Sequence, residues 1–160
     1  RQPFYDSAKK VFEMCLYKID GYVTPHSLID IFFMLSERTD ASIEKSWETI
    51  LKLRAVLYVI PENDERVFSA ARNTAFADFE DSMQNESVLF AEVDYIITRN
   101  KKDFEKAAIP VVTTEEFLIL ANRRNSKKTL IYQFLCILPV HTFCKGFFLL
   151  IVAPIFKENG

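Results

Sequence analysis

The chain has 160 residues, enough for one domain with a core of its own and, at most, a small appendage. Apolar residues make up 49% of the sequence and include fifteen Phe, which argues against global disorder. The formal net charge is −2, with acidic and basic residues interspersed. This balance excludes a strong overall field that attracts nucleic acid, although it leaves room for a local basic patch.

The cysteines and histidines narrow the class of protein further. Cys15, Cys136 and Cys144 are odd in number, form no CxxC pair and have no histidine at metal-ligand spacing. This pattern favours a reduced, cytoplasmic chain and argues against a zinc site. The whole sequence holds two histidines, which is little material for a histidine-based catalytic triad.

The N-terminal part of the chain predicts a helix, a short strand and a second helix. Residues 4–18 carry an amphipathic pattern with one apolar stripe. Asp20-Gly21 predicts a turn, and residues 22–24 predict a strand. Thr24-Pro25 then supplies an N-cap and a first helical proline for a helix that reaches about Glu37.

Asp30 is the first candidate functional residue. Its helix is apolar almost all round, so we expect Asp30 to be deeply packed. A lone buried carboxylate is costly unless it is paired or bound to a metal. The alternative is a partly exposed acid near a helix N-terminus, where it interacts favourably with the helix dipole.

The middle of the chain predicts a second strand between two further helices. Residues 41–54 form an amphipathic helix, residues 55–60 a strand, and residues 64–76 another helix. In the first of these helices we expect four side chains to face the core: Ile43, Trp47, Ile50 and Leu51. Trp47 is therefore interpreted as a core or interface anchor rather than a platform for stacking bases.

Asp78 and Asp81 open the next predicted helix, and their spacing has two interpretations. As structure, Asp78 is a good N-cap and Asp81 a good acid for the first turn, a spacing that resembles a capping box. As chemistry, two carboxylates one turn apart lie on the same helix face and both reach one cation.

A polar, basic turn follows the next strand. Residues 93–98 predict that strand, and strands separated by helices indicate βαβ units with a parallel sheet. The turn Arg99–Asp103 is either an ordinary surface loop or the rim of a phosphodiester site. Residues 111–112 predict an edge strand, and Thr113 with Glu116 fits a capping box at the start of a last helix.

Four carboxylates fall at or just beyond the ends of predicted strands, or in the following helix: Asp30, Asp78, Asp81 and Asp103. The carboxyl ends of parallel strands meet at one edge of a sheet, so we expect these acids to converge. Clustered carboxylates are usually tolerated because of a divalent cation, and Mg²⁺ or Mn²⁺ suits an all-oxygen site. Such a site supports in-line attack on a phosphodiester. The expected supporting residues are Asn100 as a polar helper and, for phosphate contacts, Arg99, Lys101 and Lys102.

The motifs DFEDSMQ, VDYIITRNKKDF and IPVVTTEEF resemble the second half of a PIN-domain protein. PFYDSAKKVF and GYVTPHSLIDIFFML resemble the family's first helix and its second strand and helix, so the resemblance covers about residues 1–120. It implies a three-layer α/β/α sandwich with a mostly parallel sheet. It also implies a metal-dependent ribonuclease, RNA as substrate and, in VapC-type toxins, an antitoxin protein as partner, with a homodimer as a further expectation.

Site residues follow from the resemblance position by position. Asp30 matches the acid of the second helical unit, which is often Glu in the family. Asp81, with Asp78 beside it, matches the central acid. Asp103 matches the last acid, and Asn100 matches the polar residue just before it. The resemblance implies that Asp30, Asp81 and Asp103 are catalytic.

One departure from the family concerns its first acid. PIN domains normally begin with a strand that ends in an Asp, and this strand is expected immediately before Arg1. We therefore expect an N-terminally truncated domain with impaired activity. A degenerate, non-catalytic scaffold that binds a protein partner or RNA is the alternative to the ribonuclease.

The other departure is the C-terminal region. The composition predicts a PIN-like domain over 1–122, a basic linker over 123–128 and an apolar tail over 129–160. A membrane span is disfavoured because polar or helix-breaking residues interrupt the apolar run: Pro139, His141, Lys145 and Gly146. Two alternatives remain open. Either Phe147–Ala153 is a buried strand in place of the missing one, or the tail is translated sequence beyond the domain end.

Overall fold

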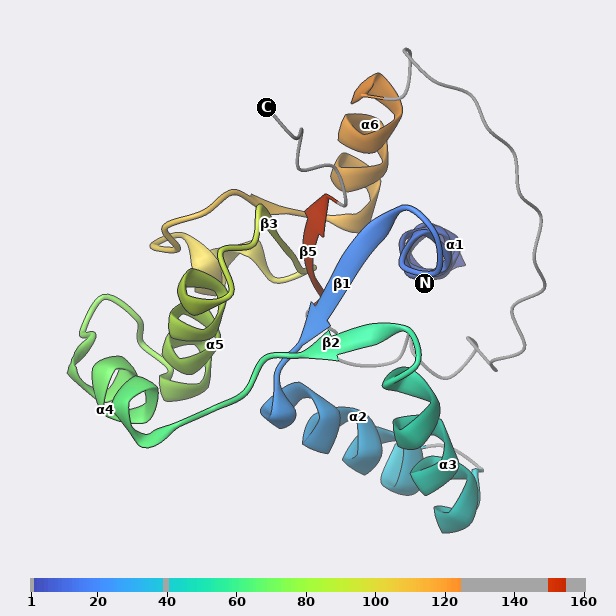
Figure 1. The fold of residues 1–160 in the computed structure, drawn as a ribbon, viewed down its shortest axis with the longest axis horizontal. Coiled ribbons are helices and arrows are strands. Elements are labelled where there is room, and N and C mark those ends of the chain that lie inside the picture. The colour runs from blue at the N-terminus through green and yellow to red at the C-terminus, as the bar shows by residue number, and fades with distance from the viewer. Residues whose placement is uncertain (1, 39–40, 125–149, 155–160) are drawn as a thin grey trace.

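The computed structural model describes residues 2–38, 41–124 and 150–154, which fold into helices around a five-stranded sheet (Figure 1). The elements in chain order are α1 (Gln2–Met14), β1 (Ile19–Val23), α2 (Pro25–Arg38), α3 (Ile43–Leu53), β2 (Leu57–Val59), α4 (Asp64–Arg72), α5 (Phe79–Phe90), β3 (Tyr95–Ile97), the 3₁₀-helix η1 (Lys101–Phe104), β4 (Val111–Val112), α6 (Thr114–Arg124) and β5 (Leu150–Pro154). Each predicted element has a counterpart near its predicted place.

The sheet has the strand order β2-β1-β5-β3-β4. β1 pairs with β2 in parallel, and β3 pairs with β4 in parallel. β5 is antiparallel to both β1 and β3, so the other four strands run in one direction and β5 runs against them. The prediction of a mostly parallel α/β fold is confirmed.

Alternating side chains on the strands define the three layers. Val23 and Ile97 join a core that also contains side chains of α1, α2, α3 and α6. Their neighbours Tyr22 and Ile96 join a second core with Val88 of α5 and Phe104 of η1. Since successive residues of a strand face opposite sides of a sheet, α5 covers the face opposite to the one covered by α1, α2, α3 and α6.

Gly21 lies inside β1, so the turn predicted at Asp20-Gly21 is wrong. A Cβ at this position would lie 2.6 Å from Leu57 Cδ2 and 2.7 Å from Cys15 Sγ. The glycine here permits the close approach of β2 and of Cys15, which follows α1, to β1 rather than a reversal of the chain.

Of the four side chains predicted to face inward from α3, Ile50 packs against the core, whereas the prediction is wrong for the other three. Trp47 and Leu51 are 58% and 74% exposed, and Ile43 is exposed as well. The buried face carries Leu53 together with two polar residues, Ser46 and Thr49. Their hydroxyls donate to the carbonyls of Ser42 and Lys45 one turn earlier, so these polar groups are buried without loss of hydrogen bonds. Trp47 instead lies over Phe32 of α2, with ring centroids 4.3 Å apart.

The apolar tail contributes β5. Leu150 lies opposite Ile97 and Ile151 opposite Tyr22, so part of the segment Phe147–Ala153 pairs as a strand between β1 and β3. Phe147–Leu149 lie outside the described residues, as do most of the predicted linker and tail, so the division at 122 and 128 stays a prediction. Within the described ranges, no helix is long and apolar enough to cross a membrane.

Candidate active site

The first turn of α5 carries the central acids. Asp78 is the N-cap, and its side chain accepts a hydrogen bond of 2.7 Å from the backbone N–H of Glu80. Asp81 lies in the first helical turn, where the positive end of the helix dipole favours a carboxylate. The capping interpretation of Asp78 is therefore correct. Capping is also compatible with a role in a site, because Asp78 and Asp81 both line the cavity described next.

Asp78, Asp81 and Asp103 line one open cavity of about 380 Å³ between α5 and η1. Phe76 and Ala77, which precede α5, form part of its wall, and Lys102 and Lys106 bring positive charge to the same cavity. Three of the four carboxylates expected to converge thus meet, although Asp103 lies 22 positions from Asp81 in the sequence.

The negative charge gathered in the cavity affects the pKa of Asp81. Burial, followed by the charges of Asp103, Asp78 and Glu80, raises the pKa of Asp81 to about 6. Each of these causes disfavours the ionised form. A cation in the cavity would reverse this balance, so the donor set fits a hard divalent ion with oxygen ligands.

Asn100 holds Asp103 in place. Its side-chain amide donates to the Asp103 carboxylate, and its own backbone N–H donates to Thr98 Oγ1 at 3.1 Å. Thr98 is buried at the end of β3, so the turn is anchored to the sheet. The structure therefore places the predicted helper directly beside the predicted last acid.

The three basic residues of the turn have different surroundings. Lys102 lines the acidic cavity. Lys101 instead forms an ion pair with Glu116 of α6, at 2.9 Å between Nζ and Oε2. Glu116 also accepts from the backbone N–H of Thr113, and Thr113 Oγ1 accepts from the N–H of Glu116, which completes the predicted capping box. Arg99 is exposed.

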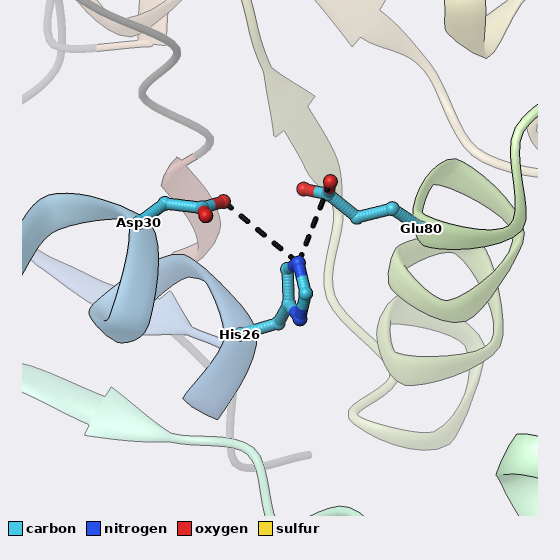
Figure 2. Close-up of side chains that lie close together, drawn as sticks. All are labelled: His26, Asp30 and Glu80. Atoms are coloured by element: carbon cyan, nitrogen blue, oxygen red, sulfur yellow. Dashed lines mark ion pairs between the residues drawn. The ribbon is translucent and has the colours of Figure 1, made fainter. Parts of the chain in front are cut away.

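Asp30 does not line this cavity and lies instead in a group with His26 and Glu80 (Figure 2). His26 Nε2 lies 4.0 Å from Asp30 Oδ2 and 3.4 Å from Glu80 Oε2, so the three side chains join α2 to α5. The prediction that Asp30 is deeply packed is wrong, because its side chain is 42% exposed. The helix turns Ile31 and Leu35 toward the core and leaves Asp30 at the rim.

Glu80 connects the two groups of acids. Burial and the charge of Asp30 raise the pKa of Glu80, while His26 lowers it. Glu80 in turn contributes to the raised pKa of Asp81. The charge of Asp30 therefore affects Glu80, and the charges of Glu80 and Asp103 affect Asp81, so the two groups of acids are electrostatically linked.

Sequence reasoning missed His26 and Glu80. His26 stands four residues before Asp30, a spacing that puts both side chains on one face of a helix. That signal was available, whereas the contact of His26 with Glu80 depends on tertiary packing.

β5 does not supply the family's first acid. Its sequence is Leu-Ile-Val-Ala-Pro, which contains no carboxylate. Leu150 lies beside Ile97, the last residue of β3, and therefore near the edge at which the site acids gather.

A family model described as PIN domain matches residues 1–102. The match ends one residue before Asp103, so it covers α1 to α5 and the start of η1. No curated protein and no solved structure matches the chain significantly. The family match covers well over half of the 160 residues and agrees with the α/β architecture. The chain therefore belongs to the PIN-domain family, whose fold is nuclease-like.

Proposed function

We propose that this protein is a metal-dependent endoribonuclease whose active centre is the cavity lined by Asp78, Asp81 and Asp103. The observation that carries the proposal is the meeting of these three carboxylates in one open cavity, at a cost visible in the raised pKa of Asp81. Carboxylates held together against their mutual repulsion are typical of a cation site.

Asp81 and Asp103 are the proposed principal ligands, with Asp78 beside them. A bound Mg²⁺ or Mn²⁺ would supply Lewis-acid activation of water and neutralise charge on the phosphate. Asn100 orients Asp103 through its amide, which is the role of a residue that positions a ligand. Asp30 is proposed to act from the adjacent group, coupled to Asp81 through Glu80.

RNA is the proposed substrate. Lys102 and Lys106 line the cavity and would contact phosphates next to the scissile bond. Lys101 is held by Glu116, so its proposed contribution is smaller, and Arg99 would contact phosphate further along the turn. The proposals of an antitoxin partner and a homodimer rest on the family resemblance, and that of a cytoplasmic location rests on the odd number of cysteines in the sequence.

The decisive experiment measures Mn²⁺ binding and single-stranded RNA cleavage together. Asp81→Asn should abolish both, while Asp94→Asn, which removes an exposed carboxylate at the other end of β3, should leave both unchanged. Unchanged Mn²⁺ affinity in Asp81→Asn would overturn the proposed metal centre. Binding of Mn²⁺ and RNA without cleavage would favour the alternative, a non-catalytic PIN scaffold.

A further inference from the structure

We propose that Phe76 is the stacking surface for one unpaired nucleobase of the RNA, and that this contact fixes the strand over the acidic cavity. The inference rests on the proposed ribonuclease function and adds a base-binding position to the phosphate and cation contacts of that site. It assigns a role to the apolar wall of the cavity, which is formed by Ala75, Phe76 and Ala77.

The lining of the cavity divides into an apolar wall and a charged remainder. Residues 75–77 supply the apolar wall, and the other lining residues are all charged: Asp78, Asp81, Lys102, Asp103, Glu105 and Lys106. A nucleotide has the same division, because every base has a flat π-face and its phosphate is an anion. The cavity volume of about 380 Å³ is within the range of small-molecule sites. A base that lies against Phe76 thus keeps its phosphate on the side of Lys102 and Lys106.

Phe76 is half-buried and packs against Phe104 of η1. The two rings meet edge to face, with centroids 6.4 Å apart and ring planes at 65°. Phe104 is buried in the second core, so it supports Phe76 from the inside. Ala75 and Ala77 are exposed and each carries only a methyl group, so Phe76 provides the one large apolar side chain of this wall.

The segment that carries Phe76 is tied to α5 before any substrate binds. The backbone N–H of Ala75 donates to Asn73 Oδ1 at 3.2 Å, and the amide of Asn73 donates to Glu86 of α5 at 3.4 Å. Glu86 also accepts from Ser69 Oγ of α4 at 2.9 Å. A surface that is already held in place loses less conformational entropy when a ligand binds to it.

The competing interpretation is that Phe76 only seals the second core. This role accounts for the contact with Phe104, but it does not account for a large apolar side chain in a cavity whose other walls are charged. Phe68 and Phe79 are 61% and 53% exposed, yet neither lines the cavity, so position rather than exposure distinguishes Phe76. The bases of a duplex are already paired and stacked, so the contact selects unpaired nucleotides.

The test combines a change in the protein with a change in the RNA. Phe76→Leu keeps an apolar side chain against Phe104 without an aromatic face. It should lower kcat/KM for single-stranded RNA by about 5-fold to 150-fold, the range expected for one stacked base. Phe76→Trp should retain activity, and Phe68→Ala, which removes an exposed ring of α4 outside the cavity, should leave kcat/KM unchanged. Thermal melting checks that each variant is folded.

An abasic nucleotide is then placed in turn at each position around the cleaved bond. At one position the wild type should lose as much activity as Phe76→Leu does on intact RNA, and Phe76→Leu should lose no more there. Losses that multiply at every position would overturn the base site.

A second readout needs no cleavage. The fluorescence of 2-aminopurine in a short single-stranded oligonucleotide, measured in EDTA, should be quenched by the wild type and not by Phe76→Leu. No quenching by the wild type, or equal quenching by both, would overturn the base site. Failure of the ribonuclease proposal is distinguishable, because it appears as absent cleavage or as Mn²⁺ affinity that Asp81→Asn does not alter, while the difference in quenching persists.

Discussion

Glu80 and Asp81 are consecutive residues in the first turn of α5, yet they serve two different groups. Glu80 faces His26 and Asp30 of α2, whereas Asp81 lines the cavity with Asp103 from η1. Successive residues of a helix are about 100° apart around its axis, so one turn addresses two neighbours. The cavity gathers several carboxylates beside Lys102 and Lys106, while the α2 group adds an imidazole. The comparison shows how one helix N-terminus presents two consecutive carboxylates to two different surroundings.

The largest expected difference between the two groups is in RNA cleavage. Asp103→Asn should reduce Mn²⁺-dependent cleavage by roughly 100-fold, because loss of a metal ligand costs on the order of 3 kcal/mol of transition-state stabilisation. His26→Gln should change the same rate by less than about threefold. Equal losses in both variants, measured with one RNA under single-turnover conditions, would mean that the groups act as one site.

The second expected effect is a pH dependence confined to the cavity. Its Mn²⁺ affinity should rise as pH increases through about 6, because the proton on Asp81 competes with the ion. Asp103→Asn should move this midpoint to lower pH, since the charge of Asp103 helps to raise the pKa of Asp81. Calorimetric titrations between pH 5 and pH 7.5 measure it, and a flat profile would contradict the cause assigned to the shift.

The same pKa shift has a defined sign for the stability of the metal-free chain. The folded state binds the Asp81 proton more tightly than the unfolded state, whose pKa is the ordinary 3.8. The resulting stabilisation is complete below pH 3.8 and is lost as pH rises through about 6. Melting temperatures of Asp81→Asn and of the wild type are compared in EDTA at pH 4 and at pH 7.5. The melting temperature of the variant minus that of the wild type should be more positive at pH 7.5 than at pH 4. Asp94→Asn is the control.

A smaller effect is expected where the two groups meet. Glu80→Gln removes the charged partner of His26 and a charge that helps to raise the pKa of Asp81. The variant should shift the pH midpoint of Mn²⁺ binding in the cavity only slightly downward. A Mn²⁺ loss as large as that of Asp103→Asn would show that Glu80 belongs to the cavity.

The smallest expected effect separates two neighbouring lysines. Lys102→Ala should lower RNA affinity and reduce the salt dependence of binding by about 0.7 in log–log slope, the value for one phosphate contact on a single strand. Lys101→Ala should reduce that slope by less than Lys102→Ala does, because its ammonium group is paired with Glu116. Its exposed ion pair contributes about 1 kcal/mol of stability at most. Binding isotherms at several salt concentrations measure both variants.

Local patterns predicted most of the fold and part of the site. The caps at Thr113 and Asp78 depend on residues within one turn, so the sequence is sufficient to find them. The meeting of Asp81 with Asp103 follows from strand direction, because the first turn of α5 and the residues after β3 gather at one edge of the sheet.

Features that depend on tertiary packing were not predictable from periodicity. For α3, hydrophobicity favours burial of the face with Trp47 and Leu51. The other face is buried instead, because Leu53 reaches the core and the hydroxyls of Ser46 and Thr49 form hydrogen bonds within the helix. Asp30 shares a helix with many apolar residues but stands at its rim beside His26. In both cases the neighbouring element, rather than the helix itself, decides which face is covered.

The position of β5 decides how the two halves of the sheet are joined. In the described sheet β5 stands between the pair β2-β1 and the pair β3-β4, and it is antiparallel to both neighbours. The strand hydrogen bonds between the two pairs therefore all pass through β5, while the hydrogen bond between Ser7 of α1 and Thr114 of α6 joins the two pairs on one side of the sheet. His26 and Asp30 follow β1 and Asp103 follows β3, so β5 stands between the two strands that carry the two sides of the site.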